Sequence, residues 1–237
     1  MKAINIVHIY PKEMNIYGDN GNVLVLQKRL EWRSIPSKVI PIGIGDKIPK
    51  ETNIIIGGGG QDAGQSIIAD DLLAKASDLK NLANEGVPML MICGMYQMFG
   101  HYFKTQLDKK IPGIGLLDVY TEAKDGRLIG NVTTKTTWGK IVGYENHSGR
   151  TFLNSKACKF GLTKKGQGNN GEDNSEGAVQ FNVFGSYLHG PILAKSPEFA
   201  DYLLDLAINN SGQNIKLSPL NNELEMLAAK TAQKRPR

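Results

Sequence analysis

A cysteine at the end of an apolar run is the residue whose type and position best suit covalent chemistry. Residues 87–92 (VPMLMI) are typical of a buried strand, and Cys93-Gly94 follow directly, before a predicted helix. A strand-to-helix turn exposes a side chain at the carboxyl end of a sheet, where the helix N-terminus favours a thiolate. Cys93 is therefore a candidate nucleophile, and the alternative is that it is only a small buried hydrophobe.

A thiolate nucleophile needs a base, and histidine is the side chain that titrates nearest neutral pH. His189, in FGSYLHGP, ends a β-rich run, and His147 lies in the polar segment GYENHSGR. His8 falls within a predicted strand and His101 follows a predicted helix, so we expect packing or surface roles for both. Spacing along the chain does not choose between His189 and His147.

Four consecutive glycines, residues 57–60, lie between an apolar strand and a helix. Such a loop can form a backbone nest for an oxyanion or let a substrate approach the main chain closely. It is not a nucleotide-binding loop, because no Gly-Lys-Ser/Thr follows and the dinucleotide-binding pattern is not well placed. The alternative is a flexible turn.

Apolar and amphipathic segments alternate through the first hundred residues, as expected for parallel strands joined by helices. The pattern predicts strands at 3–9, 39–44, 53–56 and 87–92, and helices at 23–32 and, as one helix or two, at 65–84.

The second half has β-rich stretches separated by polar turns, which favours antiparallel strands. These stretches are 116–120, 128–133, 140–144 and 178–188, with an expected exposed loop at 163–177 and helices at 196–209 and from about 221. We predict one α/β domain, 1–237: a three-layer, doubly wound, mostly parallel central sheet with an antiparallel extension. A C-terminal helix and basic tail are expected at about 219–237.

Composition narrows the class of protein. The 237 residues are 41% hydrophobic and 22% charged, as in ordinary globular proteins. No apolar run reaches the roughly 20 residues of a membrane span, and the first residues lack a signal-peptide layout, so we expect a cytoplasmic protein. Cys93 and Cys158 are the two cysteines, without metal-ligand spacing, so we expect neither a disulfide framework nor a metal site.

A net charge of +5 is compatible with a nucleic-acid-binding protein, but the distribution of the charge along the chain argues against that function. The last eight residues carry +4, which leaves +1 for residues 1–229. We therefore expect no nucleic-acid partner, and a basic tail that is solvated or lies on an acidic partner.

Four segments together resemble a known family. They are GGGGQDAGQ (57–65), ICGMYQMFG (92–100), GYENHSGR (143–150) and GSYLHGP (185–191). They resemble the class I glutamine amidotransferases, in the cobyric-acid-synthase-like branch. IYGDNGN (16–22), GLLDVYTEAKDGRLIGN (115–131) and YLHGPILAKSPEFADYLL (187–204) are similar to the glutaminase subunits of bacterial lipid II isoglutaminyl synthases, so the resemblance covers nearly the whole chain.

The resemblance implies a subunit, without a cofactor of its own, that hydrolyses L-glutamine to L-glutamate and ammonia. Its partner in a heterodimer would be a Mur-ligase-like catalytic subunit that binds ATP, Mg and lipid II. That partner would use the ammonia to amidate the D-glutamate of the stem peptide in peptidoglycan biosynthesis. Lipid II would be handled by the partner, with no transmembrane segment in this chain.

The resemblance also assigns residues. Cys93 matches the nucleophile and His189 the general base, while the N–H groups of Gly94 and Gly59 would hold the oxyanion. Gln97 would contact substrate or brace the loop.

Arg127 matches an arginine associated with substrate access, and a guanidinium suits the α-carboxylate of glutamine. On spacing alone, the segment KDGR would make Arg127 a solvated turn residue.

One departure concerns the third member of a triad. The wider class has an acid two residues after the histidine, but Gly190 and Pro191 follow His189. Either a dyad suffices, or the partner supplies a carboxylate that orients His189. The alternatives left open are a cobyrinate-type amidotransferase subunit, another cysteine hydrolase, and a catalytically silent subunit that stabilises its partner.

Overall fold

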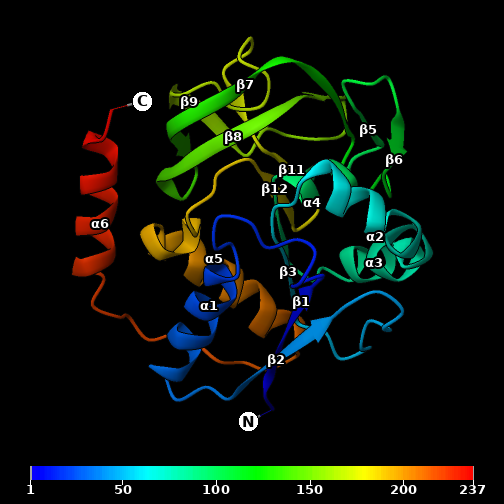
Figure 1. Ribbon diagram of the computed structural model, residues 1–237. Coiled ribbons are helices and arrows are strands. Elements are labelled where there is room, and N and C mark those ends of the chain that lie inside the picture. The colour runs from blue at the N-terminus through cyan, green and yellow to red at the C-terminus, as the bar shows by residue number, and fades with distance from the viewer. Residues whose placement is uncertain (1, 237) are drawn as a thin grey trace.

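The computed structural model describes residues 2–236, and its centre is a six-stranded sheet in the order β11-β12-β4-β3-β1-β2 (Figure 1). The strands from β12 to β2 are parallel, and β11 pairs antiparallel with β12. Their bounds are β1 Ile4–Ile9, β2 Ser37–Ile42, β3 Ile54–Gly57, β4 Met89–Ile92, β11 Ala178–Gln180 and β12 Val183–Ser186. This confirms the mostly parallel sheet.

Helices cover both faces of this sheet, which explains why its inner strands are continuous apolar runs. Figure 1 shows α1 (Gly21–Glu31) and α5 (Pro197–Asn210) on one side, and α2 (Asp62–Ala74) and α3 (Ala76–Asn84) on the other. Every residue of β3 and β4 is buried. Within residues 2–236, no helix is both long and apolar enough to cross a membrane.

Most strands of the second half form a second sheet above one end of the first (Figure 1), largely antiparallel, although β5 pairs parallel with β7. Its two long strands, β7 and β8, pair antiparallel, with Leu128 opposite His147 and a register shift between Ala123 and Leu128. The strands of this sheet are β5 Tyr102–Lys104, β6 Lys110–Pro112, β7 Val119–Thr136, β8 Gly139–Leu153, β9 Gly161–Lys165 and β10 Ser175–Glu176. The prediction of an antiparallel extension is wrong for 178–188, because β11 and β12 lie in the first sheet and β12 is parallel to β4.

The prediction of an exposed loop at 163–177 is wrong for much of that segment. It contains the end of β9 and all of β10, and Asn169 is fully buried. The Asn169 side-chain amide donates to Ser175 Oγ and to the Gly177 carbonyl, each at 2.9 Å. Asparagine side chains that satisfy backbone groups let a polar, glycine-rich segment pack inside the protein.

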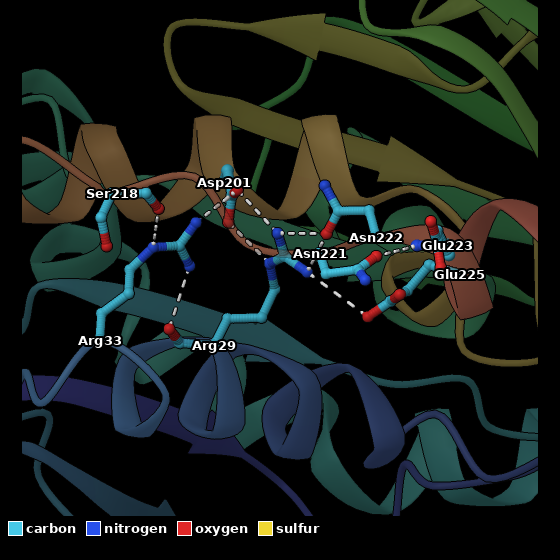
Figure 2. Close-up of polar contacts among 8 residues, drawn as sticks. All are labelled: Arg29, Arg33, Asp201, Ser218, Asn221, Asn222, Glu223 and Glu225. Carbon is cyan, nitrogen blue, oxygen red and sulfur yellow. Dashed lines mark hydrogen bonds and ion pairs between the residues drawn. The ribbon is translucent and has the colours of Figure 1, made fainter.

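The C-terminal helix α6 (Glu223–Lys234) is anchored through a buried arginine of α1 (Figure 2). Arg29 donates to both carboxylate oxygens of Asp201 on α5, at 2.6 and 2.7 Å, and to Asn222 Oδ1 at 3.1 Å. Glu225 lies 3.7 Å from the same guanidinium. A buried arginine keeps its charge, so these acceptors compensate its desolvation and hold α6 at its first turn.

Candidate active site

Cys93 occupies the predicted strand-to-helix turn, between β4 and the short helix α4 (Gly94–Phe99). Its backbone has φ +50° and ψ −105°, a conformation that a residue with a Cβ rarely adopts. The Cys93 N–H donates to the Ser186 carbonyl of β12 at 2.7 Å, which fixes the turn against the neighbouring strand. A strained turn at a strand end is the geometry that presents a nucleophile.

A cavity of about 520 Å³ opens beside Cys93. Its walls come from the glycine loop, from α2 and α4, and from the hairpin of β7 and β8; they include Gly60, Gln65, Gln97, Arg127 and His147. Cys158 lies elsewhere, exposed on the surface, so the structure separates the two thiols.

His189 follows β12 and is held by backbone hydrogen bonds to Tyr144 of β8, at 2.9 and 3.1 Å. Its Nδ1 lies 3.0 and 3.2 Å from the two carboxylate oxygens of Asp19, and both side chains are fully buried. The sequence leaves open whether a dyad suffices or the partner supplies a carboxylate, and in the structure the acid beside His189 is Asp19 of this chain. Asp19 comes from the loop before α1, 170 residues away in sequence.

The surroundings of His189 favour its charged form. Burial by itself lowers the pKa, but the negative charges of Cys93 and Asp19 outweigh burial and raise the pKa of His189 to about 10. The Cys93 side chain also hydrogen-bonds to His189, whose Nδ1 is already held by Asp19. Asp19 thus holds Nδ1 and leaves Nε2 for the thiol.

Asp19 also alters the assignment of the oxyanion site. The Gly59 N–H donates to Asp19 Oδ2 at 2.8 Å, so it is engaged, contrary to the expectation that it would bind the oxyanion. A Cβ on Gly59 would lie 2.6 Å from His189 Cε1, which explains the glycine there. Gly60 is the loop residue that lines the cavity with Cys93, and its nitrogen packs closely against Gly94.

Gln97 is buried beneath the cavity, with both ends of its amide engaged. Its Nε2 donates to the Tyr187 hydroxyl at 3.0 Å, and its Oε1 accepts from Gln65 Nε2 at 2.8 Å. These contacts favour the bracing role over a direct contact with substrate.

Arg127 lies at the cavity mouth on β7. Its Nε and Nη2 donate to the side-chain and main-chain oxygens of Asn146, at 2.7 and 2.8 Å. These bonds hold an exposed guanidinium over the opening, rather than leaving it free as in a solvated turn.

His147, the other candidate base, has a different environment. Its Nδ1 lies 2.7 Å from the Gly149 carbonyl, and its ring stacks on Tyr187 with centroids 3.6 Å apart. Burial lowers its pKa to about 3, against the smaller opposing effect of the Gly149 carbonyl. No carboxylate bonds to it in the part of the chain described, so geometry singles out His189 as the partner of Cys93.

These groups form a cysteine, histidine and aspartate arrangement that suits acyl transfer. The histidine can move a proton to and from the thiol, and the aspartate holds the tautomer of the histidine.

Comparison with known proteins agrees with this chemistry. Residues 5–197 match the CobB/CobQ-like glutamine amidotransferase domain. The chain is 38% identical to the lipid II isoglutaminyl synthase (glutamine-hydrolyzing) subunit GatD of Staphylococcus aureus, over 96% of this chain and 94% of that protein. The Streptococcus pneumoniae protein of the same name is 40% identical, over 90% and 84%.

Solved structures show the same fold at low sequence identity. A glutamine amidotransferase crystal structure superposes with a TM-score of 0.59 and 16% identity, covering 85% of this chain and 98% of that one. A chain of the PurLQS structure from Thermotoga maritima gives a TM-score of 0.58 and 18% identity, covering 88% and 99%.

Proposed function

Because this chain belongs to the CobB/CobQ-like glutamine amidotransferase family, we propose that it is the glutamine-hydrolysing subunit of a lipid II isoglutaminyl synthase. The two GatD relatives support this assignment, since the similarity runs along most of both chains. The observation that carries it is Cys93 on a strained turn, beside a cavity and next to the buried pair of His189 and Asp19.

The reactive form is the ion pair of the Cys93 thiolate and the His189 imidazolium, because the raised pKa of His189 leaves the thiol proton on Nε2 before glutamine is attacked. The thiolate attacks the carboxamide carbon of glutamine, and the N–H groups of Gly94 and Gly60 stabilise the resulting oxyanion. His189 then gives its proton to the leaving nitrogen, which departs as ammonia and leaves a γ-glutamyl thioester. Water, deprotonated by His189, hydrolyses the thioester to glutamate and regenerates the ion pair.

Two further residues position the reacting groups. Asp19 keeps the proton of neutral His189 on Nδ1 and stabilises the imidazolium that forms during the cycle. Arg127 pairs with the α-carboxylate of glutamine at the cavity mouth, because its guanidinium is already oriented by Asn146.

The ammonia passes to a second subunit, since the GatD relatives are named as subunits of a synthase. We assign that partner a Mur-ligase-like fold that binds ATP, Mg and lipid II and activates the D-glutamate carboxyl group in the cytoplasm. This chain itself uses no cofactor, because thiol chemistry with a histidine base needs none.

A donor-swap assay on the reconstituted complex tests the proposal. We expect Cys93→Ser to abolish amidation of lipid II with glutamine as donor and to retain amidation with ammonium chloride. Cys158→Ser is the matched control and should retain both activities. Glutamine-dependent amidation that survives in Cys93→Ser, or a complex that amidates a corrinoid acid but not lipid II, would contradict the assignment.

A further inference from the structure

A buried acceptor atom in the cavity is not used by the mechanism above. His147 lines the cavity with Cys93, and its side chain is almost fully buried, with the residue 3% exposed. Its Nε2 has no hydrogen-bond partner among residues 2–236. Leaving a polar atom buried and unpaired is unfavourable, so such an atom in a substrate cavity points to a ligand that pairs with it.

The contacts of the ring decide what Nε2 can do. The Gly149 carbonyl can only accept, so Nδ1 carries the proton and Nε2 presents a lone pair. The ring is held flat against Tyr187, whose hydroxyl is bonded to Gln97 and Thr151. Burial keeps the imidazole neutral, since the pKa of His147 is far below neutrality. His147 is therefore a fixed, uncharged acceptor.

Depth in the cavity identifies the matching donor. Arg127 and Asp62 are exposed at the rim, where charges of both signs suit the amino-acid end of glutamine. His147 is buried, as is Cys93, which must meet the carboxamide. On the basis of the proposed function, we propose that His147 Nε2 accepts a hydrogen bond from the carboxamide N–H of glutamine, the nitrogen that leaves as ammonia.

This contact makes His147 a specificity-determining residue. Glutamine offers an N–H at this position, whereas the γ-carboxylate of glutamate offers only an oxygen lone pair. Two acceptors that face each other repel, so the neutral imidazole disfavours the product and favours the substrate.

The test combines two variants of His147 with substrates that carry or lack the donor. His147→Asn keeps an amide near the Nδ1 position and loses the Nε2 acceptor, whereas His147→Gln can place an acceptor near Nε2. Each is assayed in the complex with L-glutamine, with L-glutamate γ-methyl ester, which lacks the carboxamide N–H, and with glutaramate, which lacks the α-ammonium group.

For His147→Asn, we expect kcat/KM to fall roughly 10-fold to 100-fold with glutamine and by a similar factor with glutaramate. The same variant should change kcat/KM for the ester by less than about 3-fold, because the ester offers no N–H to lose. His147→Gln should recover most of the loss with glutamine. In a Cys93→Ala background, the Kd values for glutamine and the ester, measured by calorimetry, should follow the same pattern.

An equal loss with glutamine and the ester would overturn the inference, since it would mean a structural or proton-transfer role. A loss confined to the substrates that carry the α-ammonium group would overturn it too, because the donor would then be that group. These failures differ from failure of the proposed function, in which the wild-type complex itself does not hydrolyse glutamine.

Discussion

Two buried histidines near the same cysteine show how environment divides chemical roles. His189 faces the Asp19 carboxylate and the Cys93 thiol, and its pKa is raised to about 10 despite burial. His147 faces a backbone carbonyl and a tyrosine ring, and burial lowers its pKa to about 3. The first is built to carry a proton and the second to remain neutral.

The difference comes from two anionic neighbours of His189, Cys93 first and then the Asp19 carboxylate. Both imidazoles are desolvated, which disfavours the charged form, but only His189 has a buried anion within hydrogen-bond distance of Nδ1 in the part of the chain described. When the environments of two histidines in one site push their pKa values apart, one histidine can carry a proton while the other stays neutral.

Removal of that carboxylate is the largest expected perturbation. Asp19→Asn should lower kcat/KM for glutamine roughly 1,000-fold, because the carboxylate no longer fixes the tautomer of His189 or stabilises its positive charge. The alkaline limb of the pH profile of kcat/KM should move to lower pH, since Asp19 raises the pKa of His189 and its loss lets the imidazolium deprotonate earlier. Steady-state glutaminase assays across pH measure both effects.

Asp70→Asn is the matched control, because Asp70 is exposed on α2. It should leave the rate and the profile unchanged. An Asp19→Asn complex with wild-type rate and an unmoved alkaline limb would show that the difference between the two histidines does not depend on Asp19.

Arg127→Met should have a smaller effect and a different signature. Loss of the guanidinium removes a contact that substrate and transition state share, so KM should rise roughly 10-fold to 100-fold with little change in kcat. Lys135→Met, an exposed cation on the same strand, is the control and should change neither. A fall in kcat at constant KM would place Arg127 with the reacting groups rather than at the mouth.

The smallest expected effect is on stability. The unfolded chain protonates His147 near its ordinary pKa of 6.5, whereas the folded protein keeps it neutral to about 3, so acid favours unfolding. Between about pH 7.5 and 5.5, wild type should lose about 1 kcal/mol more free energy of unfolding than His147→Asn. Urea titrations at the two pH values measure the difference.

If the free energy of unfolding of wild type and of His147→Asn changed equally with pH, the folded state would not lower the pKa of His147, and this prediction would be contradicted. His189 contributes with the opposite sign, because its raised pKa stabilises the fold below 6.5 and that contribution is lost as the pH rises through the folded-state pKa.

The sequence predicts those parts of the site that are local. Cys93 follows an apolar strand and precedes a helix, so its turn is visible in a dozen residues. The Asp19 contact is not visible, because it joins the loop before α1 to the end of β12 across 170 residues. No spacing rule connects such positions, and only the parallel sheet order brings the two loops to one edge.

Two other differences also come from specific polar contacts that composition does not reveal. The choice of Gly60 over Gly59 depends on a single hydrogen bond from Gly59 to Asp19, which the run of glycines cannot reveal. The segment 163–177 has the composition of a solvated loop, yet Asn169 satisfies its backbone from within. In each case, a specific polar contact overrides the local pattern: the one from Gly59 spans 40 residues, and those from Asn169 span six and eight.

The most direct test of the central claim is covalent trapping at Cys93. The complex is treated with 6-diazo-5-oxo-L-norleucine, a glutamine-mimicking electrophile, and this chain is analysed by intact mass and peptide mapping. We predict one adduct, on Cys93, that Asp19→Asn slows and excess glutamine blocks, with Cys158 unmodified as the internal control. An unmodified Cys93, or equal labelling of both thiols, would contradict the account.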